Sequence, residues 1–212
     1  MFTAHWCTMT GMNEATSTGT RSYRMRKRLE DVEETRRRIV QAAVELHGSV
    51  GPKETTISAV ASAAKVQRST VYRHFPDEEA LFGACTSHWF AGHPWPHTEE
   101  WRSEPDPARR LERGLLELYG YYDENKQMLT NAYRDIDVMP PFVGEMLRAQ
   151  VDATLAILSE PWAVPTDRGL VAAIRLALEL RTWQSFAASG LRPDEAAALM
   201  ASMVACSGAE SG

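Results

Sequence analysis

Seven polar side chains surround Val71 in the segment 67–74, and each of them can bind a nucleic acid. Every one can donate a hydrogen bond to a phosphate oxygen or to the edge of a base. The segment contains no Asp or Glu, which is unusual for a solvent-facing stretch. The alternative is an ordinary solvated helix face. We predict contact with double-stranded DNA by Gln67, Arg68, Ser69, Thr70, Tyr72, Arg73 and His74.

Two of these residues have distinct expected roles. The guanidinium of Arg68 can match guanine O6 and N7 with two hydrogen bonds, so Arg68 is the best candidate to read a base. Tyr72 can donate its hydroxyl to a phosphate. Its ring could instead belong to the core, with only the hydroxyl exposed.

Two short helices joined by a tight turn must position these side chains, because the apolar residues of 56–75 follow a helical period. Ile57, Val60, Ala61 and Ala64 form one stripe. The small side chain of Ala61 allows a second helix to approach closely, as a helix-turn-helix requires.

The rest of the chain also shows helical patterns, and no stretch alternates with the period of a strand. We expect an all-α fold. The predicted helices are about 29 or 33 to 49, 77–91, 111–122, 125–136, 140–158, 167–189 and 193–205, with a proline-rich loop over 93–107. Thr55 or Thr56 can cap the first helix of the motif, and Asp77 can cap the helix after it.

Charge divides the chain into a basic front and an acidic remainder. Residues 1–76 contain 12 Lys and Arg against 7 Asp and Glu, whereas residues 77–212 contain 11 against 21, and the whole chain has a net charge of −5. Such asymmetry is typical of a binding module joined to a different domain. We expect a disordered basic leader at 1–28, a helix-turn-helix domain at 29–76 and a helical domain at 77–212.

The leader ends in a basic cluster that could contact phosphates or a minor groove: Arg21, Arg24, Arg26, Lys27 and Arg28. The alternative is a solvated tail, or a start codon placed ahead of the true one at Met12 or Met25. Three widely spaced cysteines (Cys7, Cys85 and Cys206), no long apolar run and no signal-peptide pattern lead us to expect a cytoplasmic protein.

The strings TRRRIVQAAVEL and TTISAVASAAKVQRSTVYRHFPDEEALF resemble the DNA-binding domain of the TetR family of bacterial transcriptional regulators, over roughly residues 35–89. The resemblance implies a homodimer that binds a palindromic operator, most often as a repressor, and a C-terminal domain for dimerisation and a small-molecule effector. It assigns backbone contacts to Thr70, Tyr72 and His74, base contacts to Gln67, Arg68 and Ser69, and phosphate contacts to Lys53, Thr55 and Thr56.

Three positions depart from the family pattern. Lys65 stands where the family usually has a glycine at the turn, which predicts a strained positive φ. His47 replaces a customary phenylalanine, and Glu78 replaces a lysine that often reaches phosphate.

An effector needs an apolar cavity with a few polar anchors. The candidate lining residues, which could equally be core, are Tyr119, Tyr122, Met128, Tyr133, Phe142, Met146 and Trp183. Arg175 and Arg181 could bind an acidic effector or pair with Glu179 or Asp152, and we favour pairing. We expect the 167–189 helix and the last helix to form the dimer interface as a four-helix bundle.

Other functions have weaker support. Cys85, His88, His93 and His97 form a loose cluster without a metal-ligand spacing, so we predict no metal and no cofactor. No Gly-rich phosphate loop, nucleophile elbow or His-Glu zinc motif is present, so we predict no catalysis. A DNA-bound regulator controlled by a protein partner or a metal remains an alternative, and a helical-bundle enzyme a remote one.

Overall fold

The computed structural model describes residues 15–162 and 168–209, and every regular element within these ranges is helical, which confirms the all-α prediction. The α-helices are α1 Ala15–Ser49, α2 Ile57–Ala63, α3 Arg68–His74, α4 Glu78–Gly92, α5 Pro107–Glu124, α6 Lys126–Arg134, α7 Pro141–Ser159, α8 Arg168–Ala177, α9 Leu180–Ala188 and α10 Pro193–Ala209. Three 3-10 helices lie between them: η1 Thr98–Ser103, η2 Ile136–Val138 and η3 Glu160–Trp162.

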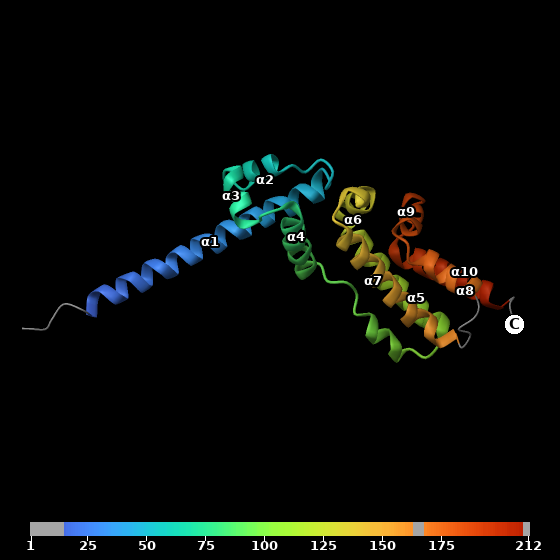
Figure 1. Ribbon diagram of the computed structural model, residues 1–212. Helices are drawn as coiled ribbons and strands as arrows, with labels where there is room; N and C mark the ends of the chain where they lie inside the picture. The colour runs from blue at the N-terminus through green and yellow to red at the C-terminus, as the bar shows by residue number, and fades with distance from the viewer. Residues whose placement is uncertain (1–14, 163–167, 210–212) are drawn as a thin grey trace, which may run out of the picture.

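Two hydrophobic cores organise these helices. The first packs the second half of α1 against α2, α3 and the start of α4, and Ile39, Val60 and Phe75 are almost fully buried in it. The second lies among α5 to α10, with α5 packed along α10. Figure 1 shows α2 and α3 beside the second half of α1, whereas the first half of α1 projects away from all other helices.

Local sequence signals set the ends of the helices around the turn. Thr56 caps α2, since its hydroxyl accepts the Ala59 backbone N–H at 3.1 Å, and Asp77 caps α4 through Ala80. Lys65, at the turn between α2 and α3, has φ of 56°, as predicted for a residue that replaces glycine. Both capping predictions and the predicted strain are therefore confirmed.

The prediction of a disordered leader through residue 28 is wrong for residues 15–28, which form the first four turns of α1. Residues 1–14, including Cys7, lie outside the described residues, as does the side chain of Arg21. The segment 15–28 contains no proline, and its second half, 21–28, holds four arginines and one lysine, which favour helix. Because the segment is polar, its composition suggested disorder, but it can lengthen an existing helix without a new nucleation step.

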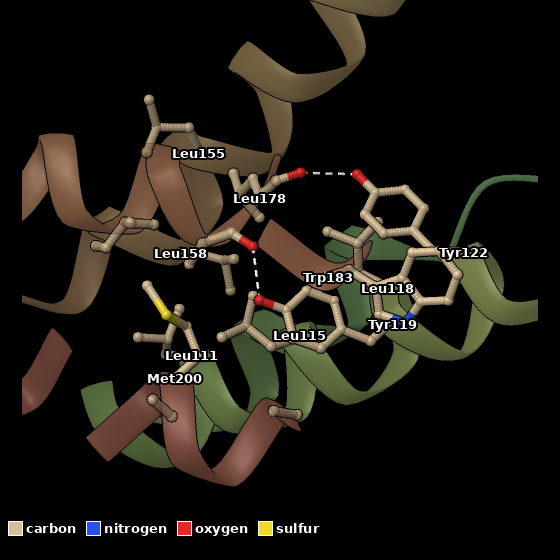
Figure 2. Close-up of a cluster of buried hydrophobic side chains, with 14 of the residues drawn as sticks. Leu111, Leu115, Leu118, Tyr119, Tyr122, Leu155, Leu158, Leu178, Trp183 and Met200 are labelled. Carbon is tan, nitrogen blue, oxygen red and sulfur yellow. Dashed lines mark hydrogen bonds between the residues drawn. The ribbon is translucent and has the colours of Figure 1, made fainter. Parts of the chain in front are cut away.

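The prediction of one long helix over 167–189 is also wrong. Two helices, α8 and α9, are separated at Leu178 and Glu179, and Glu179 has an extended backbone conformation. The hydroxyl of Tyr119 donates to the Ala177 carbonyl at 2.8 Å, and that of Tyr122 donates to the Leu178 carbonyl at 2.7 Å (Figure 2). These two hydrogen bonds from α5 satisfy carbonyls at the break, so the break is stabilised from outside the segment.

We predict that Tyr122→Phe destabilises the protein by about 1–3 kcal/mol, because it leaves the buried Leu178 carbonyl without its donor. Tyr119→Phe has the same expected effect on the Ala177 carbonyl. Urea unfolding measures both. Tyr23→Phe is the control, since Tyr23 is 58% exposed on the projecting part of α1 and should change the stability by less than about 0.5 kcal/mol. Costs no larger than that of the control would contradict the proposed role of the hydroxyls.

A second prediction concerns pH. His47 is buried and stacks on Phe82 with a ring separation of 4.8 Å, and burial lowers the pKa of His47 from 6.5 to about 4. Between these values the unfolded chain binds the proton and the folded chain does not, so stability is complete above pH 6.5 and falls as the pH drops toward 4. The titration of His47 should therefore lower the free energy of unfolding by about 2 kcal/mol between pH 7.5 and pH 5.

His47→Phe should keep the stacking and lose that part of the pH dependence, as measured by urea unfolding at the two pH values. His97→Gln, at an exposed histidine, should retain the wild-type dependence. An unchanged slope in His47→Phe would show that other groups cause the loss of stability in acid.

Candidate nucleic-acid interface

Helix α3 is held on the first core by Val71 and by Phe75 directly after it, and presents its polar side chains outward. Val71 and Phe75 are only 1% and 2% exposed. The exposed residues are Gln67, Arg68, Ser69, Tyr72 and Arg73, and the half-buried ones are Thr70 and His74. All seven residues predicted for DNA contact thus lie on or directly before one short helix, with their side chains at least partly accessible.

Arg68 and Tyr72 lie one helical turn apart and contact each other. The guanidinium of Arg68 lies 6.0 Å from the ring centre of Tyr72, and its Nη2 donates to the tyrosine hydroxyl at 3.5 Å. Tyr72 is 43% exposed, so its ring is not part of the core. This geometry favours the phosphate-donor interpretation of Tyr72 and pre-orients the Arg68 guanidinium.

His74 has a different electrostatic character from Arg73 beside it. Burial, together with the positive charges of Arg73 and Arg36, lowers the pKa of His74. The imidazole is therefore neutral near pH 7, so it can donate one hydrogen bond to a phosphate but adds no positive charge.

The three residues predicted to contact phosphate near the start of α2 differ in whether their side chains still have a hydrogen-bond donor available for a phosphate. Lys53 and Thr56 are exposed, and the Thr56 hydroxyl accepts a bond as the cap of α2 and keeps its own proton for a partner. The Thr55 hydroxyl donates to the Gly51 carbonyl at 2.8 Å. A phosphate would have to displace that bond, so Thr55 is the weakest of the three candidates.

Two arginines of α1 position the motif, and the sequence analysis did not identify them. Arg36 donates to the His74 carbonyl at 3.2 Å and lies 4.3 Å from the Phe75 ring centre, while Arg38 donates to the Ala64 carbonyl at 3.3 Å. They bind the C-terminal ends of α3 and α2, where carbonyls lack helical partners. The available signal was the run Arg36-Arg37-Arg38 at the start of the buried part of α1.

Hydrogen bonds between three residues at the end of α6 and residues 47–53 join this motif to the second core. We call this contact the α6 clasp, and its three residues are Asn131, Arg134 and Asp135. Asn131 Nδ2 donates to the carbonyls of His47 at 3.2 Å and Gly48 at 2.8 Å. These carbonyls belong to the last turn of α1, which otherwise leaves them without donors.

The other half of the clasp binds the loop between α1 and α2. Arg134 Nη2 donates to the Val50 carbonyl at 3.0 Å, and the Lys53 backbone N–H donates to Asp135 Oδ2 at 3.1 Å. Arg134 also forms a two-bond ion pair with Asp135, at 2.8 Å for each bond. The hydrogen bond from Arg134 is the main cause that lowers the pKa of Asp135 to about 2, so the clasp keeps its charge at neutral pH.

The predicted effector residues do not form one site. Met128 and Met146 line a narrow apolar cavity of about 60 Å³ between α1, α4, α6 and α7. Tyr133 lines a second cavity, of about 280 Å³, at the ends of α6 and α9. Tyr119, Tyr122 and Trp183 are buried in the second core and line neither of these cavities. The sequence could not separate the two cases, because a core helix and a pocket wall show the same apolar pattern. Phe142 also lines neither.

Arg175 and the segment 85–97 have partners that bear on two of the expectations. Arg175 pairs with Asp152 at 2.8 Å, which confirms the pairing interpretation for this arginine, whereas Arg181 has no such pair within the described part of the chain. The Cys85, His88, His93 and His97 cluster does not assemble: Cys85 is buried toward the Val40 carbonyl, and His88 bonds Gln41. No group of three or more potential metal ligands occurs among the residues that the structure describes.

Comparison with known proteins agrees with this geometry. Residues 39–85 match the model of the bacterial regulatory proteins of the tetR family. The chain is 39% identical over 56 residues to the HTH-type transcriptional repressor Rv3405c of Mycobacterium tuberculosis, which is 26% of this chain and 30% of that protein. It is 37% identical over 57 residues to the HTH-type transcriptional regulator AcrR of Shigella flexneri, which is 27% of this chain and 26% of AcrR.

The fold extends the similarity beyond the motif. A TetR-like transcriptional regulator from Rhodococcus sp. RHA1 superposes with a TM-score of 0.52 at 19% identity, over 80% of this chain and 93% of the other. The fold thus resembles that of this regulator over most of the chain, whereas the sequence match spans 30% and 26% of the length of the two relatives. In the described ranges no helix has the length and apolarity to cross a membrane.

The clasp generates a prediction that uses two glycines as a matched pair. Gly51 and Gly190 both have positive φ, 98° and 83°. A Cβ at Gly51 would collide with Arg134 and Asp135, whereas a Cβ at Gly190 would meet nothing within 4 Å. Gly190→Ala should cost about 1 kcal/mol from backbone strain alone, and Gly51→Ala should cost at least about 1 kcal/mol more, as measured by urea unfolding. Equal costs would mean that the loop and the clasp do not pack tightly.

Proposed function

We propose that this chain, which carries a TetR-family DNA-binding domain, is a transcriptional regulator that binds a palindromic operator as a homodimer and leaves it when a small molecule binds the helical body. In this proposal it acts as a repressor in the cytoplasm. The Mycobacterium tuberculosis relative is named a repressor, and its similarity covers the same N-terminal region.

The observation that carries the proposal is the acid-free polar surface of α3. It combines the candidate base reader, Arg68, with candidate phosphate donors on either side, on a helix anchored by Val71 and Phe75. A rigid helix with these donors fits the major groove of B-DNA. The remainder of the chain is acidic, so DNA would meet an attractive surface only at the front of the molecule.

Exposed apolar side chains support a second copy of the chain as partner. Leu199 and Met203 lie one turn apart on α10 and are 45% and 55% exposed, and Leu176 on α8 is 56% exposed. A twofold axis through α8 and α10 would bury them in a four-helix interface. The two copies of α3 would then lie about 34–36 Å apart, or a multiple of that, to meet successive major grooves on one side of the duplex.

The α6 clasp connects the helical body to the DNA-binding motif by direct hydrogen bonds. Any ligand that moves α6 also moves the end of α1 and the loop before α2, and a change of 1–3 kcal/mol in operator affinity is enough to regulate. Control by a protein partner on the same body remains the second candidate. A melting shift with small molecules would favour the effector, and partner capture without such a shift would favour the protein.

Fluorescence anisotropy with the DNA upstream of the protein's own gene tests the proposal. We expect specific binding at physiological salt. Arg68→Ala should weaken it by about 1–3 kcal/mol and relax the preference at one base position. Arg73→Ala should weaken binding to all sequences alike, because a phosphate contact carries no sequence information. It should also reduce by about 1 the slope of the logarithm of the binding constant against the logarithm of the salt concentration.

Arg109→Ala is the control, because Arg109 is an exposed arginine on α5 of the acidic body. Its affinity should match that of the wild type. Wild-type affinity for the upstream DNA no higher than that for random DNA would refute the operator proposal.

A further inference from the structure

The larger of the two cavities described above has the composition of a binding site for an amphipathic molecule. It has a volume of about 280 Å³ and lies where α6, α7, α8 and α9 meet, at the break between α8 and α9. Leu147, Val151, Leu178 and Leu180 provide apolar walls. Four charged side chains line the same cavity: Arg148, Arg175, Glu179 and Arg181. We call this cavity the break pocket.

The charges of the break pocket are unequal after internal pairing. Arg175 is neutralised by Asp152 at 2.8 Å. Neither Arg148 nor Arg181 has a carboxylate within 4.0 Å among the residues that the structure describes. Glu179 offsets one of these two positive charges, so one net positive charge remains.

The guanidinium of Arg148 lies where it can bind a ligand in the pocket. Its guanidinium folds back along α7 over Gly144, so that a Cβ at Gly144 would lie 3.3 Å from Nη1. Gly144 itself lines the pocket. The guanidinium therefore lies close to the backbone of Gly144, at the edge of the pocket.

We propose that the break pocket binds a small molecule with a single carboxylate on an apolar body. The carboxylate is the match for Arg148 and Arg181, since a guanidinium binds it with two hydrogen bonds in a fixed geometry. The apolar walls then take the hydrocarbon part. The single excess charge selects a singly charged head group over a neutral or a positive one.

The position of the break pocket connects it to the α6 clasp. Tyr133 and Ile136 line the pocket, and Arg134 and Asp135 between them hold residues 50–53. A ligand that shifts the backbone of Tyr133 or Ile136 also shifts the clasp residues Arg134 and Asp135, which lie between them in the chain. This regulatory consequence rests on the proposed function, whereas the binding itself does not.

Three eight-carbon probes that differ only in their head group test the inference: octanoate, octan-1-ol and octylamine. Isothermal titration calorimetry with the full chain, without DNA, should show octanoate binding at least about tenfold more tightly than the other two. Arg148→Gln and Arg181→Gln should each weaken octanoate binding about five- to tenfold and leave octan-1-ol binding unchanged. Arg109→Gln, on α5, is the matched control and should bind octanoate like the wild type.

Four outcomes decide the matter. Equal affinity for the three probes, or preference for octylamine, would overturn the inference, because the arginines would then not select the head group. Octanoate binding that both pocket variants retain would place the ligand elsewhere and would also overturn it. Octanoate binding with the expected loss in both variants would support it. If that pattern appears in a protein that fails to bind its upstream DNA, the break pocket stands and the proposed function fails.

Discussion

Hydrogen bonds from the end of α6 to the α1–α2 loop fix the DNA-binding motif against the helical body. The two hydrophobic cores are separate clusters, and Val44 on α1 packs against both. Polar bonds from Asn131, Arg134 and Asp135 fix the loop beside it. Asp135 is almost inaccessible, and a buried carboxylate without partners would be strongly destabilising. Its full set of donors therefore specifies one position of the motif relative to the body.

Beyond this contact, the body is shaped by the break between α8 and α9, which hydrogen bonds from α5 stabilise. The hydroxyls of Tyr119 and Tyr122 accompany the interruption at Leu178 and Glu179, and α9 leaves in a new direction. Without the interruption, Glu179, Leu180 and Arg181 would continue the surface of α8. The two tyrosines that the sequence suggested as pocket residues thus stabilise a break beside a pocket that they do not line.

The sequence predicted the features that depend on local physics. Helix caps at Thr56 and Asp77, the strained turn at Lys65 and the exposed polar face of α3 all follow from residue type and spacing. The break after α8 could not be predicted, because residues 177–180 contain neither Gly nor Pro and the hydroxyls come from a helix more than 50 residues away. The roles of Arg36 and Arg38 were hidden for the same reason, since their acceptors are carbonyls that only the folded chain brings near.

The length of α1 has a mechanical consequence. One continuous helix runs from the basic residues near Tyr23, past the motif, to the clasp at His47, a span of about 36 Å at 1.5 Å per residue. Such a rod converts rotation at one end into displacement at the other. A tilt of about 5° around His47 shifts the far end by about 3 Å, which is the length of a hydrogen bond. The projecting half of α1 is thus a lever that magnifies any small movement of the body.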